Sequence, residues 1–170
     1  SISLEGEELV GARTSRLRQI RGDTVAYVAQ SAAASFNPAH RLIHQFSEAP
    51  VQHGKMRQEE AERRGVDLYG QLDLPEPDKI GQRFPHQVSG GQLQRAMTAM
   101  AMGCDPRLII FDEPTTALDV TTQIEVLSTI KEAVRARGVS AIYITHDLAV
   151  VAQVADRIMV LRHGDLVEEG

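Results

Sequence analysis

The sequence predicts an α/β fold whose core is a parallel β-sheet, and three observations in its C-terminal half support this. Apolar runs at 107–111 and 140–145 are each followed by a helical pattern, at 121–138 and 147–155. Strands that are separated by helices need crossover connections, and such strands pair in parallel. The apolar runs are continuous rather than alternating, which predicts strands buried on both faces of the sheet.

The N-terminal part of the chain predicts two strand regions on either side of one helix. Residues 2–10 alternate weakly around a glycine, which is typical of a hairpin. Residues 13–21 predict a short helix, and Gly22 supplies its stop signal. The β-branched and apolar segment 24–29 predicts a strand, whereas the small and polar residues of 31–40 predict a loop.

The segment 41–102 is predicted to be mainly helical. Residues 41–49 and 54–72 are helix-like, while 74–87 is interrupted by three prolines. The clearest helical pattern follows Ser89, a favourable N-cap residue. It places four side chains on one face, at intervals of four, three and four residues: Leu93, Met97, Met100 and Cys104.

The C-terminal segment predicts one long amphipathic helix and a final hairpin. The helix at 121–138 carries an apolar face made of Ile124, Leu127, Ile130 and Val134. The last fifteen residues predict two strands that turn at His163 and Gly164.

Composition narrows the possible classes of protein. The chain has 170 residues and is 42% hydrophobic, which suits one folded domain and argues against disorder. Its formal net charge of −5 gives no general reason to expect a nucleic-acid-binding surface. Cys104 is the single cysteine, so an internal disulfide and a cysteine-cluster zinc site are excluded. Because the sequence opens on Ser1 with a strand-like segment, we expect a piece of a longer protein.

Polar side chains follow three of the predicted strands. Asp112 and Glu113 follow one, His146 and Asp147 follow another, and Gln30 follows a third. In open α/β sheets, ligands gather outside the carboxyl ends of the strands. One carboxylate could hold Mg²⁺, a second could polarise an attacking water, and the histidine could stabilise charge near a terminal phosphate. The simpler alternative is that polar residues mark where strands reach the surface.

The segment Ser89-Gly90-Gly91-Gln92 opens the clearest helix. Two glycines let a backbone approach closely, and the first turn of a helix attracts anions such as phosphate. Taken alone, the same residues are more typical of a turn and a helix cap.

Together these motifs resemble the ATP-binding subunit of an ABC transporter, and the resemblance covers essentially the whole chain. Five segments match family motifs, in the family's order: "YVAQ" at 27–30 the Q-loop, "VSGGQLQR" at 88–95 the signature, "LIIFDEP" at 108–114 the Walker B strand with the catalytic glutamate, "TALD" at 116–119 the D-loop, and "ITHD" at 144–147 the switch histidine.

The resemblance implies a role for each strand-end residue. Asp112 would hold Mg²⁺, partly through water and together with Gln30. Glu113 would be the general base that orients the attacking water. His146 would contact the γ-phosphate, and Gln30 would link the metal site to the membrane subunits of a transporter.

The resemblance also implies roles in a dimer. Ser89, Gly90, Gly91 and Gln92 would bind the γ-phosphate of an ATP that is held mainly by the opposite subunit. Asp119 would couple the two sites across the dimer. The implied cofactors are therefore ATP and Mg²⁺.

The family's architecture implies a P-loop NTPase (RecA-like) core with an inserted α-helical subdomain. Residues 1–30 would supply core strands up to the Q-loop, 31–103 the helical subdomain and 104–170 the rest of the core. The implied partners are a second ABC ATPase subunit packed head to tail, transmembrane permease subunits and, indirectly, a solute-binding protein, with no nucleic acid. The subunit would lie peripherally on the cytoplasmic face of the membrane.

Some residues depart from the family pattern. Val88 stands where leucine is usual, and Thr116 where serine is commoner before "ALD". No segment matches G-x-x-x-x-G-K-[ST], the phosphate-cradling P-loop. We therefore expect a chain truncated at its N-terminus, with the P-loop encoded upstream of Ser1, and we expect the 170 residues alone to be inactive.

The segment 35–45, "SFNPAHRLIHQ", resembles the region after the Q-loop in dipeptide, oligopeptide and nickel importers. The sequence therefore predicts an ATPase that powers the import of peptides or a related small solute. Two alternatives remain: a non-transport ABC ATPase of the DNA-repair or translation type, and a non-enzymatic fragment. Non-transport members usually carry long coiled coils, and no heptad run is present.

Overall fold

The computed structural model describes residues 1–116 and 118–170, and its elements alternate between strands and helices as the α/β prediction requires. In chain order the elements are β1 Ser3–Leu4, β2 Glu7–Glu8, α1 Thr14–Ile20, β3 Val25–Val28, α2 Ala32–Ser35, α3 Leu42–Gln52, α4 Gln58–Gln71, α5 Pro77–Ile80, the 3-10 helix η1 Pro85–Gln87, α6 Gly90–Met102, β4 Leu108–Asp112, α7 Val120–Ala136, β5 Ser140–Ile144, α8 Leu148–Val154, β6 Met159–Arg162 and β7 Asp165–Glu169.

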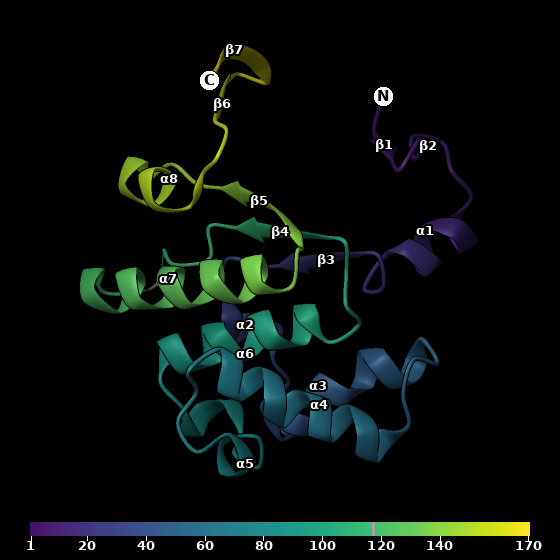
Figure 1. Ribbon diagram of the computed structural model, residues 1–170, viewed down its shortest axis with the longest axis vertical. Helices are drawn as coiled ribbons and strands as arrows, with labels where there is room; N and C mark the ends of the chain where they lie inside the picture. The colour runs from purple at the N-terminus through teal and green to yellow at the C-terminus, as the bar shows by residue number, and fades with distance from the viewer. Residues whose placement is uncertain (117) are drawn as a thin grey trace.

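The central sheet has three parallel strands in the order β3-β4-β5 (Figure 1). Val28 pairs with Phe111, and Phe111 pairs with Tyr143, so the three strands end at one edge of the sheet. The parallel sheet predicted from the alternation of strands and helices is thus confirmed. Parallel pairing is possible here because α2–α6 connect β3 to β4, and α7 connects β4 to β5.

The prediction that the strands are buried on both faces is wrong. Residues in β3 and β4 alternate between buried and more exposed positions, and β5 alternates between intermediate and exposed ones. Ala26, Val28, Ile109 and Phe111 pack into one core with residues of α6 and α7. Ile142 and Ile144 point the other way and are each 49% exposed. Apolar residues favour the strand conformation on either face of a sheet, but they are buried only where another layer packs on that face. The described helices cover only one face of this sheet.

Helices α3, α4 and α6 form a tightly packed layer, with α2–α6 together lying on one side of the sheet (Figure 1). Phe46 on α3 and Tyr69 on α4 are both fully buried, and their rings meet edge to face at 5.9 Å. Gly65 on α4 lies so close to α3 that a Cβ there would be 2.6 Å from Ile43 Cδ1. The two helices approach one another closely because glycine leaves that space open.

Two further predictions are wrong, one for a loop and one for the buried face of a helix. The predicted loop at 31–40 contains the short helix α2, because Ser31 Oγ accepts a hydrogen bond from the backbone N–H of Ala34 and caps a run of alanines. Ile124, predicted on the buried face of α7, is 49% exposed. Leu127, Ile130 and Val134 on the same helix are buried as predicted, so the covered part of α7 begins beyond its first turn.

Hairpins lie near both ends of the chain. β1 pairs with β2, and β6 pairs with β7 through a turn at His163 and Gly164, which have φ angles of 54° and 92°. Both hairpin predictions are confirmed. Every residue of β6 and β7 is exposed, and this hairpin projects from the body on the side away from α3–α5 (Figure 1). Within the described residues, no helix combines the length and the hydropathy needed to cross a bilayer.

Candidate functional site

The carboxyl ends of β4 and β5 are joined and bring the predicted site residues to one edge of the sheet. The backbone N–H of Glu113 donates to the carbonyl of Ile144 at 2.9 Å, which extends the pairing of the two strands by one residue. The arrows of β4 and β5 point toward the side where α7 and α8 begin (Figure 1). Side chains that follow either strand therefore share this edge with the first turns of two helices.

Glu113 forms the centre of a three-residue polar cluster. Its Oε1 lies 2.6 Å from Nδ1 of His146, and the hydroxyl of Thr116 donates to its Oε2 at 2.7 Å. A carboxylate can only accept, so Nδ1 of His146 carries the proton in this contact. The backbone of Glu113 is in the left-handed region, with φ of 45°, which is uncommon for a residue other than glycine. Both carboxylate oxygens are thus held, and the histidine is tied to the acid.

The contacts in this cluster shift two pKa values. The hydroxyl of Thr116, followed by the ring of His146, lowers the pKa of Glu113. The hydrogen bond and the charge of Glu113 raise the pKa of His146. Glu113 therefore stays ionised, as a group that attracts a proton from water must, and the site can hold an imidazolium beside it.

Asp112, the last residue of β4, lies on the exposed face of the sheet. Its Oδ2 accepts a hydrogen bond of 2.5 Å from the hydroxyl of Tyr27 on the neighbouring strand β3. Among the described residues this is the one hydrogen bond of the Asp112 side chain, so its Oδ1 stays available to another ligand. The sequence motifs identified Asp112 but missed Tyr27. The only signal for Tyr27 was alternation, since it and Asp112 share a face once β3 and β4 pair in parallel.

The residue types at this edge fit a Mg²⁺ ion bound together with a nucleotide. Mg²⁺ in proteins is held by one or two carboxylates, with phosphate oxygens and water completing the octahedron. Asp112 offers one open carboxylate oxygen, and the described residues contain no group of three or more acidic, histidine or cysteine side chains that could enclose an ion. A site of this kind needs the phosphates of a substrate to be complete.

The Ser89–Gln92 segment forms a capping box at the start of α6. Ser89 Oγ accepts from the backbone N–H of Gln92 at 3.3 Å, and Gln92 Oε1 accepts from the backbone N–H of Ser89 at 3.0 Å. A Cβ at Gly91 would lie 2.7 Å from Thr122 Cγ2, so this glycine permits the close contact of α6 with α7. The helix-cap interpretation is confirmed, and phosphate binding by this segment stays a prediction.

Two further acidic residues begin helices at the same edge. Asp119 caps α7, because its carboxylate accepts from the backbone N–H of Thr122 at 3.1 Å and from its hydroxyl at 2.7 Å. These bonds lower the pKa of Asp119. Asp147 caps α8 by accepting from the backbone N–H of Ala149 at 2.8 Å. Ala117, in the middle of the predicted D-loop, lies outside the described residues.

Gln30 follows β3 by two residues and is exposed. Because β3 and β4 are parallel neighbours in register, Gln30 lies at the edge where Asp112 and Glu113 emerge. Within the part of the chain that the structure describes, no hydrogen bond joins its side chain to either of them. The structure thus joins Glu113 to His146, with Asp112 next to Glu113 in the chain, and the link from Gln30 to the metal site stays a prediction.

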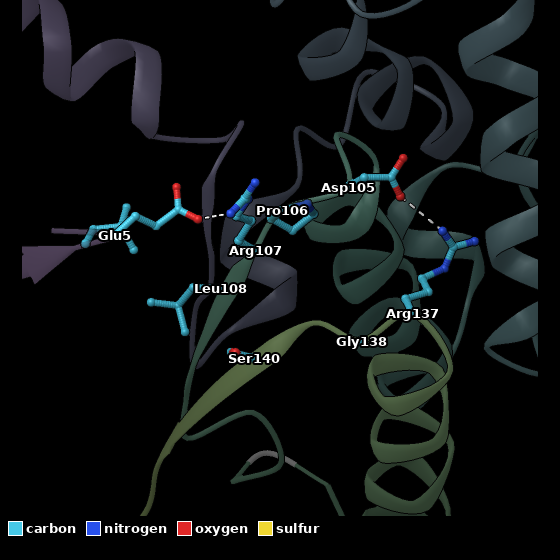
Figure 2. Close-up of a pocket in the computed structure, with 9 residues that line it drawn as sticks. Glu5, Asp105, Pro106, Arg107, Leu108, Arg137, Gly138 and Ser140 are labelled. Atoms are coloured by element: carbon cyan, nitrogen blue, oxygen red, sulfur yellow. Dashed lines mark hydrogen bonds and ion pairs between the residues drawn. The ribbon is translucent and has the colours of Figure 1, made fainter. Parts of the chain in front are cut away.

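A cavity of about 660 Å³ lies at the opposite edge of the sheet, where β4 and β5 begin. Figure 2 shows its polar lining, in which Arg107 is paired with Glu5 and Arg137 with Asp105. None of the predicted site residues lines this cavity. Its arginines and carboxylates are already partnered, so its size alone does not indicate a binding site.

Comparison with known proteins gives consistent matches. The sequence model of the family described as "ABC transporter" matches residues 1–116. The chain is 41% identical over 169 residues to the probable D,D-dipeptide transport ATP-binding protein DdpD of Escherichia coli, covering 99% of this chain and 52% of that protein. It is also 41% identical over 169 residues to the oligopeptide transport ATP-binding protein OppD of Bacillus subtilis, covering 99% of this chain and 47% of OppD.

Solved structures agree with the sequence matches. A dimeric structure of a post-hydrolysis state of the ATP-binding cassette MJ0796 bound to ADP and Pi superposes with a TM-score of 0.83 and 27% identity. The superposition covers 98% of this chain and 71% of that one. The chain spans about half the length of the curated relatives named above.

Proposed function

The chain belongs to the ABC transporter family, and on that premise we propose that it forms part of the ATP-hydrolysing subunit of an importer of peptides or related small solutes. One observation supports the chemistry most directly. Glu113 is held between Thr116 and His146, at the end of the strand that carries Asp112. This arrangement supports Glu113 as the base that orients a water for attack on the γ-phosphate, with His146 offering a positive charge beside it.

Catalysis of the proposed reaction rests on positioning the reacting groups and on stabilising charge in the transition state, as in phosphoryl transfer generally. Bound Mg²⁺ would neutralise phosphate charge, and Asp112, with Gln30, would hold it. Glu113 would take the proton of the attacking water as the oxygen–phosphorus bond forms and ADP leaves. His146 would then stabilise charge that builds on the phosphate oxygens.

We also propose that the active unit is a head-to-tail pair of cassettes. The dimeric state of the solved relative supports this. Ser89, Gly90, Gly91 and Gln92 would then face the nucleotide of the opposite cassette, and Asp119 would couple the two sites. The residue ranges 1–30, 31–103 and 104–170 would be the core strands, the helical subdomain and the remaining core.

The proposed partners follow from the relatives, which are transport ATP-binding proteins. Transmembrane permease subunits would dock near Gln30, so the cassette would lie at the cytoplasmic face of the membrane. A solute-binding protein would deliver the peptide to them. Uptake of peptides by vesicles that carry the assembled transporter, with and without ATP, tests the proposal. Absence of peptide uptake would contradict the solute class, and uptake that is independent of ATP would contradict the coupling to ATP hydrolysis.

The decisive experiment is Glu113→Gln in the complete gene product, assembled with its partner subunits. A general base contributes about 10²–10⁴-fold to a rate, so we expect ATP hydrolysis to fall by that factor while ATP binding is retained. Glu125→Gln is the matched control, because Glu125 is an exposed residue of α7 within the described chain. Hydrolysis by Glu113→Gln at the unaltered rate would overturn the proposed role.

A further inference from the structure

Tyr27 is the residue of β3 that reaches across the sheet to Asp112. It pairs with Ile110 in the register of β3 and β4, and its side chain lies on the exposed face that also carries Asp112. Its hydroxyl donates to Asp112 Oδ2 at 2.5 Å, a short distance typical of a bond from a neutral donor to a carboxylate. The two residues are 85 positions apart in the sequence.

Packing does not explain this tyrosine. It is 57% exposed, whereas its neighbours Ala26 and Val28 on the opposite face are buried. The same face of β5 carries Ile142 and Ile144, which offer no donor to a carboxylate. The contact with Asp112 is therefore the one specific interaction that the tyrosine hydroxyl makes within the described residues.

From this geometry we propose that Tyr27 is a positioning residue for the metal-binding carboxylate of Asp112, a role that rests on the proposed function of Asp112. The hydroxyl fixes Oδ2 and so fixes the rotation of the carboxylate group. Oδ1 is then the oxygen offered to a divalent cation or to one of its waters. Partners that orient a metal ligand are worth about 10–100-fold in metal affinity.

The environment keeps the hydroxyl suited to this task. The hydrogen bond to Asp112, followed by partial burial and by the carboxylate charge, raises the pKa of Tyr27. The phenol therefore keeps its proton near neutral pH and can donate it to the carboxylate. A phenylalanine at this position would keep the ring and its place on the sheet but would free the carboxylate to rotate.

The test is Tyr27→Phe in the complete gene product, with Mn²⁺ as the probe ion and electron paramagnetic resonance as the readout. We expect that, with ATP present, the variant binds Mn²⁺ about 10–100-fold more weakly than the unaltered protein does. The midpoint of its unfolding should be unchanged. Tyr143→Phe is the matched control. It removes a hydroxyl from β5, which flanks β4 on the side away from β3, and does so on the other face of the sheet. Among the described residues, that hydroxyl has no partner. Unaltered Mn²⁺ affinity in Tyr27→Phe would overturn the proposal.

Asp112→Asn tests the proposed metal-binding role of Asp112 separately from the positioning role of Tyr27. If Asp112→Asn leaves Mn²⁺ affinity unaltered, the metal role of Asp112 fails, and the role of Tyr27 fails with it. If Asp112→Asn weakens binding but Tyr27→Phe does not, only the inference fails. The double variant should bind Mn²⁺ no more weakly than Asp112→Asn alone, because the tyrosine acts through that carboxylate. Additive losses would show that Tyr27 acts in another way.

Discussion

The helical layer of α3, α4 and α6 and the edge where β4 and β5 end are held together by different forces. Phe46, Leu68 and Tyr69 in the layer are fully buried and belong to one hydrophobic core. At the edge, the side chain of His146 is 75% exposed and that of Glu113 is 23% exposed, and hydrogen bonds rather than packing hold them.

This difference separates stability from chemistry. Apolar packing fixes the positions of buried side chains. Because the interior is close-packed, removing a buried atom lowers the stability of the fold. Exposed polar contacts add little to stability, since water can replace either partner. The same exchange lets a substrate or an ion take the place of a protein partner. Groups at the edge can therefore exchange partners during a reaction while the layer behind them stays in place.

The largest effect on stability should come from Phe46→Ala in the packed helical layer. Removing a fully buried phenylalanine leaves a cavity and costs about 3–5 kcal/mol of unfolding free energy. Leu161→Ala, in the hairpin and 68% exposed, is the control, for which we expect a change within about 0.5 kcal/mol. Chemical denaturation measures both. Equal losses in the two variants would contradict the comparison.

A pair of glycines on one helix gives a finer test of the packed layer. A Cβ at Gly65 would lie 2.6 Å from Ile43 and 2.8 Å from Phe46, so Gly65→Ala should destabilise by about 1–3 kcal/mol through overpacking. At Gly70 on the same helix, the nearest atom would be Pro77 Cγ at 3.7 Å. Gly70→Ala should therefore stabilise by up to about 1 kcal/mol. In thermal unfolding, Gly65→Ala should lower the unfolding temperature and Gly70→Ala should raise it. A loss of stability in both variants would show that α4 itself does not tolerate alanine.

The smallest expected effect is the pH dependence of the stability that the Glu113–His146 contact contributes. Glu113 raises the pKa of His146 above its ordinary value of 6.5, and the contact in turn helps to lower the pKa of Glu113. The pair therefore stabilises the fold between these two pKa values. Its contribution is lost as the pH rises through the raised value of His146, or falls through the lowered value of Glu113.

Glu113→Gln should move the titration midpoint of His146 down toward its ordinary value, because the negative charge is removed. Titration of the imidazole proton resonances by nuclear magnetic resonance measures this midpoint. Glu125→Gln removes an equal charge on α7 and should leave the midpoint where it is. An unchanged midpoint in Glu113→Gln would mean that the contact between the two residues does not persist in solution.

Local patterns by themselves determined most of the secondary structure. Ser89 as N-cap, a glutamine three residues later and Gly103 at the far end specify α6 without help from the rest of the chain. The run that ends in Asp112 and Glu113 likewise specifies β4 and places two carboxylates at its end. These features were predictable because caps and periodicity act between residues close in sequence.

Tertiary structure alone decided which surfaces are covered and which side chains meet. Ile124 and Ile142 are apolar and exposed, because covering depends on where distant helices lie. Tyr27 meets Asp112, 85 positions further along the chain, because β3 and β4 pair in one register, and no short window of sequence encodes that pairing. The sequence thus determined the chemical groups and their place on each element. The packing of the elements decided which of those groups could act together, because packing depends on contacts between segments far apart in the chain.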